Sequence, residues 1–78
     1  MSRSDVPETV RKGTPTQKLV YKTLEHADGP LDQTAIAERS YLPKRSVREA
    51  LGDLEDTGAI ESTVNMKDTR RKLYWLDK

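Results

Sequence analysis

LDQTAIAERSYLPKRSVREALGDLEDTGAIESTVNMKDTRRKLYWL, residues 31–76, is the stretch that decides the fold. It contains two short helical patterns, and the second one opens at Pro43 and stops at Gly58. The apolar side chains of this second helix follow the spacing of one buried face: Val47, Ala50, Leu51 and Leu54. Beyond Gly58 the helical spacing gives way to a strand pattern.

The strand pattern begins at Ile60, where apolar and polar side chains alternate as far as Asn65. Tyr74 and Leu76 continue the same buried face on a return strand, and polar residues 66–71 are predicted to turn between the two strands. Leu31 is a candidate for a short third strand at the edge of this hairpin. Residues 60–76 therefore predict a β-hairpin with one buried face.

Upstream, the sequence predicts a further helix and the start of the next one. Thr14 can accept a hydrogen bond from a free backbone amide, and Gln17 completes a capping box. This helix is expected to end before the Gly-Pro pair at 29–30, and Asp32 is expected to cap a helix that runs to about Ser40. The predicted core consists of Leu19, Leu24, Ile36, Leu42, Val47, Leu51, Leu54, Ile60, Val64, Tyr74 and Leu76.

The length of 78 residues predicts one small domain. Residues 1–13 are polar and are expected to form a flexible N-terminal arm, which leaves 14–78 as the folded domain. The chain has no Cys, so it has no disulfide and no Cys-based zinc site. Neither a membrane-spanning apolar run nor an apolar signal core is apparent, and a cytoplasmic protein is expected.

Positive charge gathers at two places that lie far apart in the sequence, although the net charge is only +1. Lys44, Arg45 and Arg48 form one cluster at a helix start. Residues 67–72 form the other, with four basic side chains and one acidic one. This distribution indicates a polarised molecule with a basic face.

Residues 31–76 resemble the winged helix-turn-helix of the MarR and ArsR types of transcription regulators. The matching pieces are Ile36-Ala37-Glu38, residues 42–47 (LPKRSV), residues 54–60 (LEDTGAI), and Asp68-Thr69-Arg70 leading into residues 73–76 (LYWL). The resemblance implies an α+β fold, with a three-helix core and a C-terminal β-hairpin wing. Two departures from the family pattern are noted. Ser40-Tyr41 stands where the family often has Gly, and we expect a minimal protein that lacks the C-terminal dimerisation helices of MarR relatives.

The resemblance and the charge pattern together predict sequence-specific binding to double-stranded DNA. A recognition helix over 44–57 is expected in the major groove, with Arg45 or Arg48 reading bases. The wing, residues 66–72, is expected near the minor groove, where the resemblance implies that Arg70 enters and Asp68 orients it. The predicted DNA-binding residues are Gln33, Thr34, Lys44, Arg45, Ser46, Arg48, Lys67, Arg70, Arg71 and Lys72. A homodimer on a two-fold operator is considered as the assembly, and no cofactor, metal or small-molecule ligand is expected.

The alternative function is a winged helix that binds another protein. Its contact is either the acidic helix face formed by Glu49, Asp53 and Asp56 or an apolar patch around Trp75. Strand alternation turns Trp75 away from the core, but packing under the first helix is an equal possibility. Catalysis finds no support, because no nucleophile with a base, carboxylate pair or phosphate loop can be assembled at motif spacing. The operator, the regulated process and the direction of regulation stay open.

Overall fold

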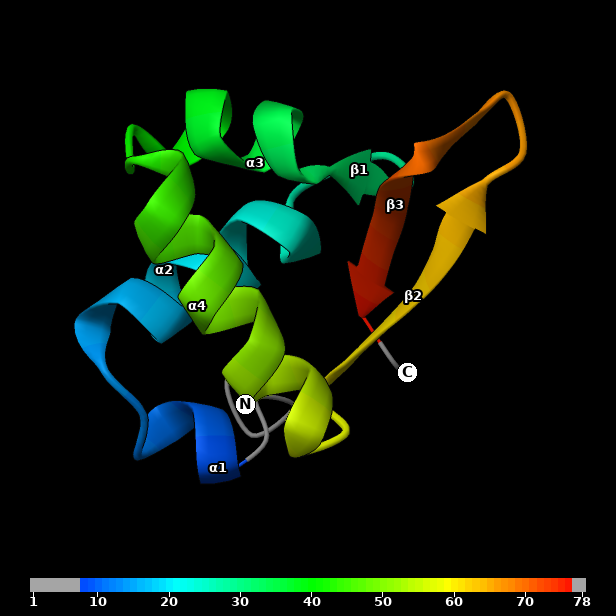
Figure 1. The fold of residues 1–78 in the computed structure, drawn as a ribbon. Helices are drawn as coiled ribbons and strands as arrows, with labels where there is room; N and C mark the ends of the chain where they lie inside the picture. Colours follow the sequence, from blue (N-terminus) through cyan, green and yellow to red (C-terminus); the bar gives the residue numbers. More distant parts are fainter. Residues whose placement is uncertain (1–7, 77–78) are drawn as a thin grey trace.

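The computed structural model describes residues 8–76, which form a helical body with a three-stranded sheet at one side (Figure 1). The sheet is antiparallel with strand order β1-β3-β2. In chain order the elements are α1 (Glu8–Arg11), α2 (Pro15–Glu25), β1 (Leu31–Asp32), α3 (Gln33–Ser40), α4 (Lys44–Asp56), β2 (Ile60–Asn65) and β3 (Asp68–Leu76). This arrangement is a winged helix, and the predicted α+β fold class is confirmed.

The helix boundaries follow the capping residues of the sequence. Thr14 caps α2, because its side-chain oxygen accepts a hydrogen bond from the Gln17 backbone nitrogen at 3.1 Å. Asp32 caps α3 in the same way, through a 2.8 Å hydrogen bond from the Ala35 nitrogen. Gly58 follows the end of α4 with a φ of +81°, a conformation that favours glycine.

The core lies between the helices and the inner face of the sheet. Its buried side chains are Val10, Val20, Tyr21, Leu24, Ile36, Ala37, Val47, Ala50, Leu51, Leu54, Ala59, Ile60 and Tyr74. Leu31, Leu42 and Leu76 pack against them partly buried. Most of the predicted core is thereby confirmed.

For two of the predicted core residues, Leu19 and Val64, the prediction of burial is wrong. Leu19 is 41% exposed, because the inward face of α2 is formed instead by Val20, Tyr21 and Leu24. Val64 is 45% exposed, because it lies on the outer part of the hairpin, which extends past the helices (Figure 1). Both errors concern the placement of a correctly identified element against its neighbours.

The structure differs from the predicted arm over residues 1–13. Residues 1–7 lie outside the described residues, but Glu8–Arg11 form the short helix α1. Val10 on this helix is 1% exposed and belongs to the core. The part of the predicted arm that the structure describes is therefore packed against the domain.

The hairpin turn is tighter than predicted. Asn65 pairs with Asp68, so the turn consists of Met66 and Lys67 alone. The Asn65 side-chain oxygen accepts a 2.9 Å hydrogen bond from the Lys67 nitrogen, which closes the turn locally. The predicted third strand is confirmed, because Leu31 pairs with Tyr74 of β3.

Tyr41 joins α3 to α4 in a left-handed backbone conformation, with a φ of 62°. This is the turn in which the resemblance predicted that Gly is common. A side chain with a Cβ is disfavoured in this conformation by about 1–2 kcal/mol. The Tyr41 side chain is 94% exposed, so packing does not offset the disfavoured backbone.

Replacing Tyr41 with Gly should therefore raise the free energy of unfolding by about 1 kcal/mol, measured by urea denaturation. Tyr41→Ala is the matched control, since it removes the ring but keeps the Cβ. Its free energy of unfolding should stay within about 0.5 kcal/mol of the wild type. Equal stabilisation by both variants would show that the ring, and not the backbone conformation, is unfavourable.

Candidate nucleic-acid interface

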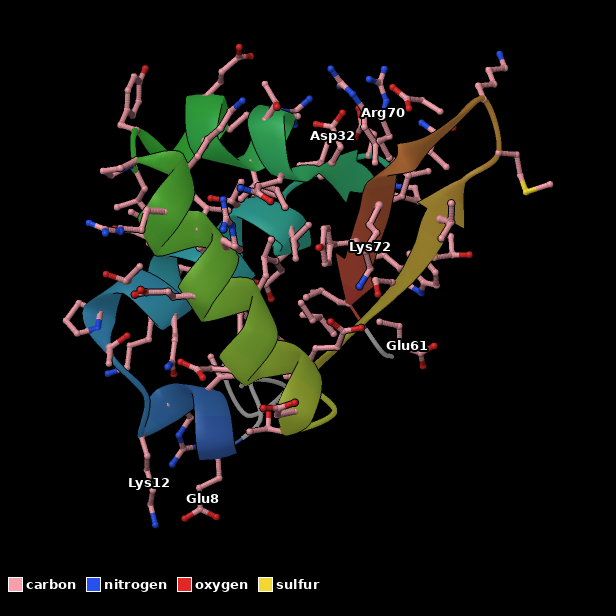
Figure 2. The ribbon with its side chains drawn as sticks, viewed as in Figure 1. Glu8, Lys12, Asp32, Glu61, Arg70 and Lys72 are labelled. Atoms are coloured by element: carbon pink, nitrogen blue, oxygen red, sulfur yellow. The ribbon has the colours of Figure 1, made fainter. Side chains whose placement is uncertain are left out.

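The two basic clusters of the sequence meet on one side of the folded molecule. The start of α3, the start of α4 and the first half of β3 surround a cavity of about 390 Å³. Figure 2 shows Asp32 and Arg70 at this end of the molecule, with Lys72 further along β3. Seven of the ten predicted DNA-binding residues line the cavity: Gln33, Thr34, Lys44, Arg48, Arg70, Arg71 and Lys72.

The other three predicted residues lie around this cavity rather than in its lining. Arg45 is exposed on the side of α4 that faces away from the core, as the helical spacing requires. Ser46 is turned toward α2 and lines a separate cavity of about 220 Å³ together with Thr14 and Gln17. Lys67 is exposed in the hairpin turn.

Within residues 8–76, none of the cations at the start of α4 (Lys44, Arg45 and Arg48) forms a close ion pair, although the charge of Lys44 also acts on Asp32 and helps to lower the pKa of its carboxyl. The first turn of α4 also contains no acidic residue, and Pro43 supplies no side-chain cap. Positive charge at a helix N-terminus is opposed by the helix dipole. These side chains are therefore available to an external anion.

Arg70 is presented to solvent from β3. Its Nε donates a 3.2 Å hydrogen bond to Asp68 Oδ1, and its backbone nitrogen donates to the same oxygen at 3.1 Å. The Arg70 side chain nevertheless remains 90% exposed. The predicted charge-assisted hydrogen bond from Arg70 to Asp68 is thus present.

Arg71, in contrast, is engaged by two carboxylates. Its Nη1 lies 2.7 Å from Asp32 Oδ2, and its Nε lies 3.6 Å from Asp68 Oδ2. The backbone hydrogen bond from Ala35, together with the Arg71 guanidinium, holds the pKa of Asp32 below its usual value. Arg71 is thus held by two carboxylates of the protein, which counts against Arg71 as a phosphate contact.

Lys72 shares its charge with a carboxylate of α4. Its Nζ lies 3.9 Å from Glu55 Oε1 and 5.6 Å from the centre of the Tyr74 ring. Ser62 of β2 donates a 2.6 Å hydrogen bond to the other oxygen of Glu55. Burial, followed by the nearby Glu55 charge, raises the pKa of Tyr74. These contacts join the hairpin to α4.

Asp32 and Glu55 were missed as members of this site by sequence reasoning. Asp32 was predicted only as a helix cap, and Glu55 was not predicted to take part in the site. Each forms an ion pair with a basic residue of β3. Local sequence patterns carry no signal for these pairs, because β3 is distant from both residues in the chain.

Some of the residues considered for protein binding already make contacts within this protein. Trp75 is half-buried and lines a cavity of about 530 Å³ together with Leu24 of α2, Pro30 of the following loop and Thr63 of β2. On the acidic face, Asp53 accepts a 2.9 Å hydrogen bond from the Gln17 side chain. Glu49 remains exposed.

Metal binding and membrane crossing each require a recognisable structural feature. Across residues 8–76, no group of three or more His, Asp or Glu side chains is arranged to hold a metal ion. Within the same range, no helix combines the length and apolar character that crossing a membrane requires.

The fold is similar to solved structures of transcription regulators. PcaV from Streptomyces coelicolor, in complex with its natural ligand, superposes with a TM-score of 0.78 at 28% identity, over 97% of this chain and 51% of PcaV. A mutant of MepR from S. aureus gives 0.73 at 28% identity, over 99% of this chain and 61% of MepR. A MarR family transcription regulator gives 0.77 at 18% identity, over 97% of this chain and 53% of that regulator.

The sequence itself matches no protein-family model and no curated protein. The chain spans about half the length of PcaV. The structural similarity confirms the predicted resemblance: the chain has a winged helix of the MarR type, and the structures it resembles are transcription regulators rather than enzymes.

Proposed function

We propose that this protein is a transcription regulator that binds double-stranded DNA sequence-specifically, with α4 in the major groove and the hairpin wing near the minor groove. The observation that carries the proposal is the meeting of cations from α4 and β3 around one cavity. A helix N-terminus in the major groove with a hairpin beside it is an established way for proteins to contact a duplex. The similarity to MarR-type regulators supports the same function.

The proposed roles follow from charge, exposure and geometry. Arg45 and Arg48 read base edges, because the planar guanidinium pairs with guanine through two hydrogen bonds. Lys44 and Lys67 contact phosphates as point charges. Arg70, the highly exposed wing arginine, enters the minor groove.

Gln33 and Thr34 supply a phosphate contact from the start of α3. Both line the cavity, and the Gln33 side-chain nitrogen donates a 3.3 Å hydrogen bond to the Lys44 backbone oxygen. That bond holds the start of α3 against the start of α4. The starts of α3 and α4 are thereby fixed beside each other, where both can contact the same stretch of the DNA phosphate backbone.

We also propose that the regulator acts as a homodimer. A single module of this size buries limited surface on DNA, and a two-fold pair doubles that surface on a palindromic site. Analytical ultracentrifugation of the protein with a palindromic duplex should give two protomers per duplex. A single protomer on each duplex would overturn the dimer proposal without affecting DNA binding itself.

A salt titration tests DNA binding. If about six phosphates are contacted, the affinity for a duplex should fall roughly a thousandfold between about 50 and 200 mM salt. Fluorescence anisotropy with a labelled duplex measures this slope. The absence of binding at the lowest salt concentration would contradict the proposed function.

A further inference from the structure

Four charged side chains form a continuous chain from the start of α3 to the wing. Asp32 Oδ2 lies 2.7 Å from Arg71 Nη1, and Arg71 Nε lies 3.6 Å from Asp68 Oδ2. Asp68 Oδ1 accepts a 3.2 Å hydrogen bond from Arg70 Nε. Carboxylates and guanidiniums alternate along this chain, so each internal charge has a partner of opposite sign on both sides.

Asp32 anchors the chain to the helical body. Its Oδ1 accepts the capping hydrogen bond of α3, and its Oδ2 accepts from Arg71. The Asp32 side chain is 20% exposed, whereas that of Arg71 is 53% exposed. Asp32 is the least exposed of the four side chains and Arg70 the most exposed, so the chain is anchored at its Asp32 end.

The outer hairpin lies away from the helices, which makes such an anchor useful. Figure 1 shows the tip of the hairpin projecting past the helical body, while β1 lies against β3 nearer the helices. Asp32 pairs with Leu73 in this short ladder, which brings its carboxylate beside the start of β3. Figure 2 shows Asp32 and Arg70 together at this end of the sheet.

We propose that Asp32 is a positioning residue for DNA binding: by holding Arg71, and through it Asp68, it fixes the direction in which Arg70 is presented to the minor groove. The inference rests on the proposed DNA-binding function. In this account Arg71 does not contact a phosphate but connects Asp32 to Asp68. A carboxylate that lines the DNA-binding cavity is then required for tight binding.

The direction of the change in DNA affinity on removing the Asp32 carboxylate distinguishes a positioning role from simple electrostatic repulsion. A carboxylate near phosphates repels them, so its removal should strengthen binding if charge alone matters. If Asp32 orders the wing, its removal should weaken binding, because Arg70 must then be ordered when DNA binds. The two cases give changes of affinity in opposite directions.

Asp32→Asn is the decisive variant. Asn is as good an N-cap as Asp, so α3 keeps its capping hydrogen bond. The new amide group, however, carries no charge and turns donor hydrogens toward a guanidinium that has only donors. Affinity for a labelled duplex should fall about threefold to tenfold. Unchanged or tighter binding would overturn the inference.

The matched control is Asp28→Asn, which removes the same charge from an exposed loop carboxylate. Within residues 8–76 the structure gives Asp28 no ion pair. Its removal should leave the affinity unchanged or slightly higher. Equal weakening by the Asp28 and Asp32 variants would overturn a specific role for Asp32.

A second measurement separates this inference from the proposed function. In the protein without DNA, ¹⁵N relaxation should show greater mobility of the backbone amides of residues 66–72 in Asp32→Asn than in the wild type. Arg71→Gln should produce the same change, and combining the two substitutions should add little to either. Failure of the wild type to bind DNA would reject the function, whereas unchanged wing mobility in both variants would reject the anchor.

Discussion

Replacing Arg45 and Arg70 together with Ala is expected to weaken binding to duplex DNA by about a hundredfold. Each well-formed guanidinium contact with a base contributes about 1–3 kcal/mol, and 1.4 kcal/mol corresponds to tenfold in affinity. The two residues lie on different elements, α4 and β3, so their effects should add. Fluorescence anisotropy at constant salt concentration provides the measurement.

The control removes the same charge from another part of the surface. Lys18 and Lys22 lie exposed on α2 and do not line the cavity between α4 and β3. Replacing both with Ala should weaken binding only about threefold, because their effect is long-range and screened by salt. Full affinity after loss of Arg45 and Arg70 would refute the assignment of the interface. Equal losses in the two double variants would show that total charge, and not the site, governs binding.

Leu51→Ala should lower the free energy of unfolding by about 2–5 kcal/mol. Leu51 is 2% exposed and lies on the buried face of α4 within the single core. A domain of this size has a marginal stability of about 5 kcal/mol, so the variant should be largely unfolded at elevated temperature. Urea denaturation followed by circular dichroism measures the change.

Leu19→Ala is the matched control for this experiment. It makes the same chemical change on α2, but at a side chain that is 41% exposed. The free energy of unfolding should fall by no more than about 1 kcal/mol, because most of the transfer free energy of a buried leucine is absent. A loss as large as that of Leu51→Ala would contradict the placement of the core.

The sequence was sufficient for the three longer helices, α2, α3 and α4, because their boundaries depend on nearby residues. Thr14 and Asp32 accept hydrogen bonds from amides three residues further along the chain. Gly58 adopts the positive φ that helix ends favour. Such interactions are encoded locally, and they predicted the order of the elements from α2 onward and the class of fold.

The placement of elements against one another was harder to predict. The choice between Leu19 and Tyr21 as the inward-facing residue of α2 depends on the rotation of the helix about its axis. The burial of Val10 depends on how α1 packs against the rest of the core. Both are properties of packing, to which short-range periodicity is insensitive.

The candidate site shows the same division. The basic residues of α4 and β3 were visible as clusters in the sequence, and the fold brings most of them to one cavity. The ion pair between Asp32 and Arg71 joins residues 39 positions apart. It arises from the pairing of β1 with β3, which determines which side chains become neighbours. Charge patterns therefore indicated the basic face but not the carboxylates that organise it.

Mapping the contact face directly is the strongest test of DNA binding through this surface. Backbone amide shifts should be recorded by NMR while a generic duplex is added at low salt, which locates contacts without the natural operator. The shifts should concentrate at residues 33–34, 44–48 and 67–72. Shifts confined to the surroundings of Trp75 or to the acidic end of α4, with the basic cavity unperturbed, would contradict the account.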